Sequence, residues 1–491
     1  MEWEGMDYKK KFIEVCQAIA PIINAIGQKG GKAYMVGGAV RDLVLRYEVK
    51  DIDIEVHSIA LDDLVVTLSL FGHVREVGKQ FGVIRVDGCD IDWSLPRKDS
   101  KGRKPEVIID PSMTLKDACR RRDLTMNALA VDMHQVCALI DKGIDPVESM
   151  SIIDFYGGLA DIAAKRLAAI DDQLFCDDPL RFFRVMQFIG RFEMQPTEAL
   201  NALCARMSFV DQVRNVPIAK ERIYEEIKKL LLKSRAPSLG FRWLLSIGRL
   251  KEIFPELYAL IIIQQRPDYH PEGSAFEHTM QTLDAAACYE HYQAWNTLSA
   301  EDEKLMLLCA ALMHDLGKAV TTDARLSCHG HERAGVAFAQ QMMQRLTNEH
   351  VLISAVKKLV LYHGLPIQLA QSSSLAKFKK YASKLAPESC LRHIFILARA
   401  DLLGRNPTQG KPLKGLEKFS SQALLRVFFE KSLQAGVLNR PEPAVLQGRD
   451  FLDVVEPGPA IGRLVAAAYE LQINEGISDP CVLKNRVLKK K

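Results

Sequence analysis

A short apolar segment that runs into two glycines, followed by two aspartates one residue apart, constrains this chain more than any other feature. Residues 33–36 are typical of a β-strand, and Gly37 and Gly38 follow them directly. A helical stretch then leads to Asp51 and Asp53 in a second strand-like segment. Because side chains alternate along a strand, the two aspartates project from the same face. Two carboxylates on one face form an oxygen-rich site that suits Mg²⁺.

The glycines and the residues after them are suited to a phosphate group. Glycine lets a backbone approach a phosphate closely, and the start of the helix that follows favours an anion. Arg41 and Asp42 lie within that helix. An isolated pair of aspartates would be weak evidence, since paired surface aspartates are common. In combination with GGAVRD, the pair predicts a site that transfers a nucleotide from a triphosphate.

Length and composition indicate a multi-domain globular protein. At 491 residues the chain is too long for one core, so three or four domains are expected. The net charge of +4 permits RNA binding without requiring it. No apolar run approaches a membrane span, and MEWEGMDYKK is not a signal peptide. The 11 cysteines include no CxxC pair, which favours reduced thiols in a cytoplasmic protein.

Hydrophobic patterning divides the chain into five parts. Residues 1–32 predict a leading amphipathic helix, and residues 33–140 alternate short strands with helices. The five expected strands are AYMV, DIDIEV, HVREV, GVIRV and DIDWSL. Strand signals fade after His134, so residues 141–263 are expected to be helical. A break rich in proline and glutamine opens a histidine-rich helical part, residues 264–405. Residues 406–491 are expected to form a helical tail with a basic, solvated or RNA-binding end.

A third carboxylate is expected beside Asp51 and Asp53, because two-metal nucleotide transfer usually needs a further acidic ligand. The strand-like segment CDIDWSLPR offers Asp90 and Asp92 on one face. Asp92, which lies five residues before Arg97, is the candidate. The strand is otherwise apolar, and a buried acid needs a partner. The alternative is a solvent-facing edge strand with alternating aspartates.

The segment RRRDLTMNAL supplies side chains suited to a triphosphate. Arginine carries a planar fork of donors that neutralises phosphate oxygens, which makes Arg122 a candidate. Asn127 can donate to a phosphate oxygen or a sugar. Asp123, four residues before Asn127, would share its helical face. The alternative is a basic helix start whose charges are merely solvated.

The segment CDDPLRFFRVMQF contains a candidate reader of base edges. Asp178 and Arg181 are three residues apart, so we expect them to lie together on one helix. Aspartate accepts from an exocyclic amine, and arginine donates to ring acceptors. Cytosine and adenine both offer an amino group beside a ring nitrogen, so the pair could accept CTP and ATP and reject UTP and GTP. The alternative is an acidic pair, Asp177 and Asp178, that stabilises a helix dipole with Arg181 as its ion-pair partner.

Taken in order, these segments resemble the class II tRNA nucleotidyltransferases, the CCA-adding enzymes of the polymerase β superfamily. The resemblance covers about residues 33–260 densely, and it resumes in the histidine-rich part and near GRDFLDVVEPGPAIGRLVAAAYELQ. The matching segments are VGGAVRDLVL, KDIDIEV, VGKQFGVIRV, RRDLTMNAL, YGGLADI, DDPLRFFRVMQF and KERIYEEIKKLL.

The resemblance implies an α+β fold, in which a nucleotidyltransferase head with a small mixed β-sheet precedes all-α neck, body, HD and tail domains. It implies addition of CCA to the tRNA 3′ end from CTP and ATP, with release of pyrophosphate. Asp178 and Arg181 would be the protein template for C and A. The family commonly has an arginine where this chain has Gln187, so one cationic contact is expected to be missing. The implied Mg²⁺ ligands are Asp51 and Asp53, and the implied nucleotide contacts are Gly38, Arg41, Arg122, Arg181 and Arg184.

The histidine-rich part indicates a second chemistry. Histidine and carboxylate together suit a transition metal, and an adjacent His-Asp pair follows an apolar helix here. The pattern resembles the HD phosphohydrolase superfamily. The resemblance implies His278, His314, Asp315 and Asp401 as first ligands, and His331 and His363 could complete a second site.

A divalent Ni, Mn, Co or Fe ion in that part would activate water against a phosphoester, such as a 2′,3′-cyclic phosphate or a nucleotide. The alternative is a degenerate HD domain that serves as a helical scaffold.

Three other functions remain open. A bacterial poly(A) polymerase shares the head and neck motifs, although such polymerases generally lack an HD domain. A partial enzyme would add only CC or only A. An HD phosphohydrolase could carry a non-catalytic RNA-binding head, but the intact Asp51, Asp53 and RRD residues argue against that.

Overall fold

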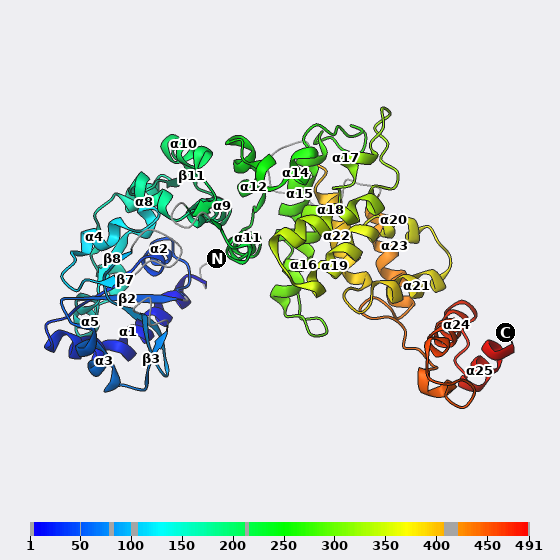
Figure 1. Cartoon of the computed structure of the whole chain (residues 1–491), viewed down its shortest axis with the longest axis horizontal. Coiled ribbons are helices and arrows are strands. Elements are labelled where there is room, and N and C mark those ends of the chain that lie inside the picture. The colour runs from blue at the N-terminus through cyan, green and yellow to red at the C-terminus, as the bar shows by residue number, and fades with distance from the viewer. Residues whose placement is uncertain are drawn as a thin grey trace. The chain divides into compact units, whose positions relative to one another are not determined.

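The computed structural model describes residues 4–49, 51–77, 83–99, 107–211, 216–406 and 421–489. Parts of two segments quoted above, Lys50 of KDIDIEV and residues 78–82 of VGKQFGVIRV, lie outside these residues. The chain divides into two compact units, Met1–Glu226 and Ile227–Lys491. The first contains the main sheet and the second is helical (Figure 1), which confirms the expected α+β class.

A seven-stranded mixed sheet organises the first unit, in the order β3-β4-β5-β2-β1-β8-β9. β2 and β5 are parallel, and every other neighbouring pair is antiparallel. The five expected strands are confirmed. Two further strands are short, and the last lies beyond residue 140, where the expected head ended. The bounds are β1 Lys32–Val36, β2 Ile52–His57, β3 Val74–Val77, β4 Val83–Val86, β5 Cys89–Ser94, β8 Leu129–Asp132 and β9 Ile152–Asp154.

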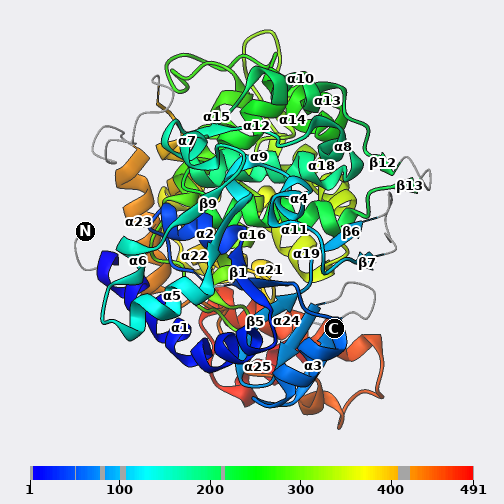
Figure 2. The same ribbon diagram turned by 90° about the vertical axis from the view of Figure 1, so that its left-hand side faces the viewer.

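The predicted leading helix is α1 (Glu4–Gln28), which packs against β1 and α5 (Met133–Asp141) (Figure 2). Ile19, Ile23 and Ile26 of α1 are buried, as expected for an amphipathic helix. The remaining elements around the sheet are α2 Gly38–Val44, α3 Leu61–Ser69, β6 Arg97–Asp99, β7 Val107–Ile109, α4 Leu115–Arg120, η1 Thr125–Asn127, α6 Pro146–Ser149 and α7 Gly158–Ala163.

The rest of the first unit is mainly helical, and α9 (Leu180–Phe192) is its central element. Phe182 and Phe183 on α9 are buried and pack with Phe209. Burial of these rings fixes which face of α9 is left for charged side chains. The neighbouring elements are β10 Arg166–Leu167, α8 Asp172–Asp177, β11 Gln195–Pro196, α10 Glu198–Arg206, β12 Val210–Asp211 and β13 Val216–Pro217; α11, Lys220–Lys233, begins in this unit and ends in the next.

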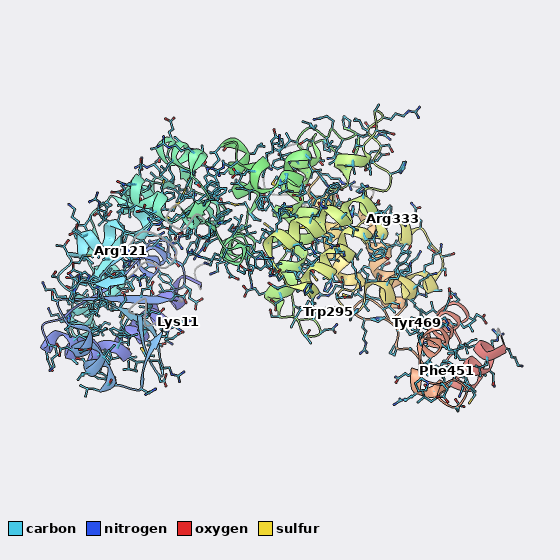
Figure 3. All side chains as sticks on the ribbon, in the orientation of Figure 1. Lys11, Arg121, Trp295, Arg333, Phe451 and Tyr469 are labelled. Atoms are coloured by element: carbon cyan, nitrogen blue, oxygen red, sulfur yellow. The ribbon has the colours of Figure 1, made fainter. Side chains whose placement is uncertain are left out.

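The second unit is built on α15 (Ala275–Ala287), α16 (Ala300–Met313) and α22 (Leu391–Leu403), which pack against one another. Ser299 and Asp302 form a capping box at the start of α16. Trp295, labelled in Figure 3, donates from Nε1 to the carbonyl of Asn439 over 2.7 Å. The other helices are α12 Ser238–Ser246, α13 Leu250–Ile253, α14 Pro255–Ala259, α17 Lys318–Thr321, α18 His331–Leu346, α19 His350–Tyr362, α20 Leu365–Ala370, α21 Leu375–Leu385 and α23 Ser421–Gln434.

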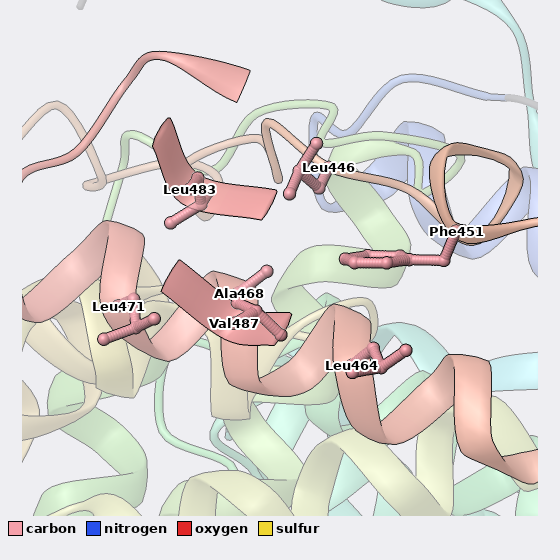
Figure 4. Packing of buried hydrophobic residues seen from close by; sticks show 7 residues of the cluster. All are labelled: Leu446, Phe451, Leu464, Ala468, Leu471, Leu483 and Val487. Carbon is pink, nitrogen blue, oxygen red and sulfur yellow. The ribbon is translucent and has the colours of Figure 1, made fainter. Parts of the chain in front are cut away.

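The C-terminal elements enclose a small core of their own (Figure 4). They are η3 (Gly448–Phe451), α24 (Pro459–Glu475) and α25 (Pro480–Lys489). The core residues are Leu446, Phe451, Leu464, Ala468, Leu471, Leu483 and Val487.

Across the described residues, none of the helices has the length and apolarity that crossing a bilayer requires.

Candidate functional site: a carboxylate cluster in the head and a histidine cluster in the helical unit

The three candidate carboxylates of the head lie on neighbouring strands. Asp53 on β2 is the register partner of Asp92 on the parallel strand β5, and Asp51 directly precedes β2. Ile52 and Ile54 are buried while Asp51 and Asp53 face outward, as strand alternation predicts. Burial raises the pKa of Asp53, and the nearby Asp92 and Asp51 carboxylates add to the rise while Arg122 opposes it. The carboxylates repel one another when they are ionised, and a cation between them would relieve this repulsion. Because all the ligand atoms are oxygens, the cluster fits a hard cation such as Mg²⁺.

Asp92 already has a partner. The guanidinium of Arg85 on β4 pairs with both of its carboxylate oxygens, at 3.1 Å from Nη2 to Oδ2 for the second contact. Sequence reasoning did not select Arg85, although alternation on an adjacent strand was the available signal. Asp92 would have to exchange this arginine for the ion in order to act as a ligand.

The diglycine makes room for Arg122. Gly37 has a φ of 75°, a conformation that favours glycine, and a Cβ there would collide with Nη1 of Arg122. Within the described residues, Nε of Arg122 is buried without a hydrogen-bond partner. Gly38 begins α2. The turn therefore brings the half-buried guanidinium of Arg122 beside the diglycine, where its charge acts on Asp53.

Arg41, Asn127, Asp123 and Arg184 form one buried network. Arg41 donates from Nη1 to Oδ1 of Asn127 over 2.6 Å, and Asn127 donates from Nδ2 to Oδ1 of Asp123 over 2.8 Å. Arg184 on α9 donates from Nε to Oδ2 of Asp123 over 2.5 Å. Burial opposes ionisation of Asp123, yet Arg184 and Asn127 hold the pKa of its carboxyl well below the usual range.

This network corrects one expectation. Asp123 and Asn127 do not share an α-helix, because α4 ends at Arg120 and only the short η1 covers Asn127. The two side chains still meet, since Asp123 also accepts from the Leu124 backbone N–H and turns the chain there. The alternative, a basic helix start, is also wrong, because the arginines before Asp123 lie at the end of α4.

The expected placement of Asp178 and Arg181 on one helix is wrong. Asp178 is extended, with φ −116° and ψ 101°, and α9 begins only at Leu180. The reason is Pro179, which disfavours helical conformation in the residue before it. Asp178 accepts from the Leu180 backbone N–H over 3.1 Å, and its Oδ2 lies 3.5 Å from Nη2 of Arg222.

Arg181 is held by backbone carbonyls. Nη1 donates to the carbonyl of Leu174 over 2.9 Å, and Nη2 donates to that of Arg121 over 2.5 Å. Arg121, labelled in Figure 3, in turn lies 3.2 Å from the buried carboxylate of Glu55. Gln187, which stands where the resemblance expects arginine, is 2% exposed, and its Nε2 has no partner among the described residues.

The six candidate ligands of the histidine-rich part converge. Asp315 lies between two pairs of histidines. Its Oδ2 is 3.2 Å from Nε2 of His314 and 3.6 Å from Nε2 of His278, which form the first group. Its Oδ1 is 3.4 Å from Nε2 of His331 and 3.9 Å from Nε2 of His363, which form the second group. Asp401 on α22 joins the first group, at 3.0 Å from Nε2 of His278. His329 is exposed.

The tautomers explain why these atoms suit a cation. Nδ1 of His314, His331 and His363 each lies 2.7–2.8 Å from a backbone carbonyl, so each Nδ1 carries the proton. The Nε2 atoms then lie close together, at 3.3 Å between His278 and His314 and at 3.1 Å between His331 and His363. Each pair of ring nitrogens beside the carboxylates favours a positive charge between them, either a proton or a metal ion. The mixed imidazole and carboxylate set fits a transition metal.

The charges of this cluster are strongly coupled. Burial opposes ionisation of Asp315, yet His314 and Lys318 hold the pKa of its carboxyl well below the usual range. Burial also opposes protonation of His278, but Asp401 and Glu272 outweigh it and raise the pKa of that imidazole to about 9. Burial lowers the pKa of His363 to about 4. A metal would have to displace the His278 proton.

Sequence reasoning missed three further residues around this cluster. Lys318 lies 2.6 Å from Oδ2 of Asp315, Arg405 lies 3.1 Å from Oδ1 of Asp401, and Glu272 lies 2.8 Å from Nδ1 of His278. The i,i+3 and i,i+4 spacings of Lys318 and Arg405 from the ligands were readable signals. Glu272 lies on a loop, where no spacing rule applies.

The sheet, the carboxylates and the helical histidine cluster define a nucleotidyltransferase head joined to an HD domain. Family models agree: "Poly A polymerase head domain" matches residues 33–168, "Probable RNA and SrmB- binding site of polymerase A" matches residues 211–260, and "HD domain" matches residues 275–403. More narrowly, the chain belongs to the family of multifunctional CCA proteins, the bacterial CCA-adding enzymes that carry an HD domain.

Two relatives show this membership. The Multifunctional CCA protein of Pasteurella multocida is 32% identical over 385 residues, which cover 76% of this chain and 84% of the relative. That of Methylobacillus flagellatus is 30% identical over 459 residues, which cover 91% of this chain and 100% of the relative.

Solved structures share the fold. The CCA-adding enzyme in its apo form II aligns with a TM-score of 0.59 at 16% identity, covering 97% of this chain and 96% of the other. The Bacillus stearothermophilus CCA-adding enzyme in complex with CTP aligns with a TM-score of 0.58 at 18% identity, covering 96% and 95%.

Proposed function

We propose that this protein adds CCA to the 3′ end of tRNA from CTP and ATP and releases pyrophosphate. The observation that carries the proposal is the pairing of Asp53 with Asp92 across β2 and β5, with Asp51 beside them. The family of multifunctional CCA proteins supplies the substrate class. In the reaction, the terminal 3′-hydroxyl oxygen of the tRNA attacks the α-phosphorus of CTP or ATP, and the bond to pyrophosphate breaks.

Each head residue has a part in this proposal. Asp51 and Asp53, with Asp92, would hold Mg²⁺, which supplies charge stabilisation to the phosphoryl transfer. Gly37 and Gly38 let the triphosphate approach the backbone, and Arg122 neutralises it. The other nucleotide contacts that we propose are Arg41, Asp123, Asn127 and Arg184, with Asp178 and Arg181 as the reader of C and A.

Labelled nucleotides test this function. Purified protein is incubated with Mg²⁺, a tRNA that lacks its CCA end, and CTP, ATP, UTP or GTP singly and together. We expect C from CTP alone, and CCA from CTP with ATP. Long A tracts would indicate a poly(A) polymerase, and arrest after CC would indicate a partial enzyme. Absence of all incorporation would indicate a non-catalytic head.

We propose a second activity, metal-dependent phosphohydrolysis, at the histidine cluster. The facing Nε2 atoms around Asp315 support it. His278, His314, Asp315 and Asp401 would hold one divalent Ni, Mn, Co or Fe ion, and His331 and His363 with Asp315 would hold another; such an ion supplies activated water. Hydrolysis of a 2′,3′-cyclic phosphate, assayed with each metal in turn, is the test. No hydrolysis with any metal would favour the scaffold alternative.

The five-part organisation and a cytoplasmic location are also proposals. The HD family model at residues 275–403 falls inside the part at 264–405, which supports that boundary. All 11 cysteines are free thiols, which supports a reducing compartment. Limited proteolysis would cut between the parts, and fractionation would locate the protein.

A further inference from the structure

The loop between α14 and α15 is closed at its base by backbone hydrogen bonds between its two ends. Gln264 and Ser274 form an antiparallel bridge at its base, and the backbone N–H of Gln265 donates to the carbonyl of Gly273 over 3.1 Å. Inside the loop, His270 donates to the carbonyl of Arg266 over 2.9 Å. The loop therefore has a fixed path, although it contains no helix or strand.

Two side chains of this loop reach the histidine cluster. Gln265 accepts from Nζ of Lys318 over 2.6 Å, and Lys318 also contacts Asp315. Glu272 has a completely buried side chain, and its Oε1 lies 2.8 Å from Nδ1 of both His270 and His278. The loop thus contacts His278 directly through Glu272, and Asp315 indirectly through Gln265 and Lys318.

His278 differs from the other three histidines in the group that contacts Nδ1, the ring nitrogen on the side away from Asp401 and Asp315. His314, His331 and His363 each place Nδ1 on a backbone carbonyl of their own helix region. His278 instead has Nδ1 within ion-pair distance of the Glu272 carboxylate, at 2.8 Å from Oε1, while Nε2 lies 3.0 Å from Oδ1 of Asp401. A carboxylate behind a ligating histidine fixes the tautomer and makes the imidazole a stronger donor than a neutral carbonyl does.

We propose that Glu272 is a positioning residue for metal binding, which orients His278 with Nε2 toward the ion and strengthens it as a ligand. The inference rests on the proposed metal site of the HD domain and deepens it. His270 is the second partner of Glu272, with its Nδ1 2.8 Å from Oε1. In this proposal Glu272 acts through His278 and is not a catalytic residue.

Cobalt titration of the full-length protein tests the proposal. The chelator-treated protein is titrated with Co²⁺, and the visible d–d absorption reports both affinity and ligand geometry. We expect Glu272→Gln to weaken Co²⁺ binding about 10- to 100-fold and to shift the absorption bands. Asp268→Asn removes a carboxylate from an exposed position of the same loop and should leave both unchanged. Thermal unfolding of the same samples, followed by far-ultraviolet circular dichroism, controls for folding of the helical unit.

His270→Ala provides a second variant if Glu272→Gln does not fold. This change keeps the contact between Glu272 and His278, so the Co²⁺ affinity should stay within about threefold of wild type. That is a much smaller change than the one expected for the loss of Glu272. A large loss would mean that His270 and Glu272 themselves hold the ion, and would overturn the positioning role. Unchanged Co²⁺ affinity and spectrum in Glu272→Gln would overturn this inference alone. Wild-type protein that binds no Co²⁺ would overturn the proposed metal site, and this inference with it.

Discussion

At the scale of single residues, the carboxylates of the head make the most direct prediction. We expect Asp53→Ala and Asp51→Ala to reduce nucleotide incorporation to background and to leave tRNA binding nearly intact, because the metal ligands act in the chemical step. Incorporation assays and a filter-binding assay would measure the two properties. Wild-type incorporation by either variant would contradict the metal assignment.

The third carboxylate has a matched control on its own strand. Asp92 is in register with Asp53, whereas the exposed Asp90 is not. Asp92→Ala should therefore reduce incorporation strongly, and Asp90→Ala should not. Equal effects of the two changes would show that register with Asp53 does not decide which aspartate takes part.

The proposed base reader gives a second prediction at this scale. Asp178→Ala or Arg181→Ala should allow UTP or GTP to be incorporated, since the loss of one partner costs about 1–3 kcal/mol of discrimination. Incorporation of each nucleotide singly measures this. Asp177→Ala, at the exposed neighbouring position, is the control. Strict selection of C and A by both variants would exclude the pair.

Sequence reasoning was strongest where a side chain acts through its own strand or helix. Alternation placed Asp51 and Asp53 correctly on one face. Helical spacing failed for Asp178, because the spacing of two residues does not take into account that Pro179 disfavours helical conformation in the residue before it. Arg85 was overlooked although strand alternation pointed to it, whereas Glu272 and the carbonyl contacts of Arg181 were not predictable, since only the tertiary fold brings these partners together.

At the scale of elements, five strands and the leading helix were predictable because their periodicity is strong. β8 and β9 were not, because each short strand lies beside segments with a helical pattern, α5 in particular, and β9 falls in a part where the strand signals fade. Periodicity could not predict the convergence of α15, α16 and α22 on one cluster, since it marks a buried face without naming its partner. The resemblance to the HD phosphohydrolases implied that convergence through their shared ligands.

The junction of α12 and α15 gives a prediction about pH. Asp284 on α15 accepts from the Ser238 backbone N–H over 2.9 Å and from its hydroxyl over 2.6 Å. Burial outweighs these bonds and raises the pKa of Asp284 to about 6. As pH rises from about 4 to about 6, the unfolded carboxyl therefore loses its proton first, and stability falls by up to about 3 kcal/mol.

We expect Asp284→Asn to match wild type near pH 4 and to become the more stable protein by pH 7. Calorimetric Tm values of full-length protein at pH 4.5, 5.5 and 7 would measure the difference. Asp268→Asn, an exposed aspartate of the same unit, should show no such divergence. A difference that is constant with pH would mean that Asp284 does not titrate in this range.

At the scale of the whole molecule, the two clusters belong to different compact units. We expect His314→Ala to abolish phosphohydrolysis and to spare CCA addition, and Asp53→Ala to do the reverse. Each variant would be assayed for nucleotide incorporation with Mg²⁺ and for hydrolysis of a cyclic phosphate with Ni²⁺, Mn²⁺ or Co²⁺. His329→Ala, an exposed neighbour, should change neither activity. Loss of both activities in a folded His314 variant would show that the sites depend on each other.

The position of Asp315 has a consequence for how the helical unit takes up metal. Its two oxygens face two different sets of histidines, so an ion held by one set draws negative charge from the carboxylate that the other set must share, and two cations so close together repel each other. By linkage, the first ion disfavours the second. We therefore expect uptake in two separate steps, with singly loaded molecules as the main species at half saturation. Native mass spectrometry of partly loaded protein would show only the statistical share of singly loaded molecules if the two positions filled independently.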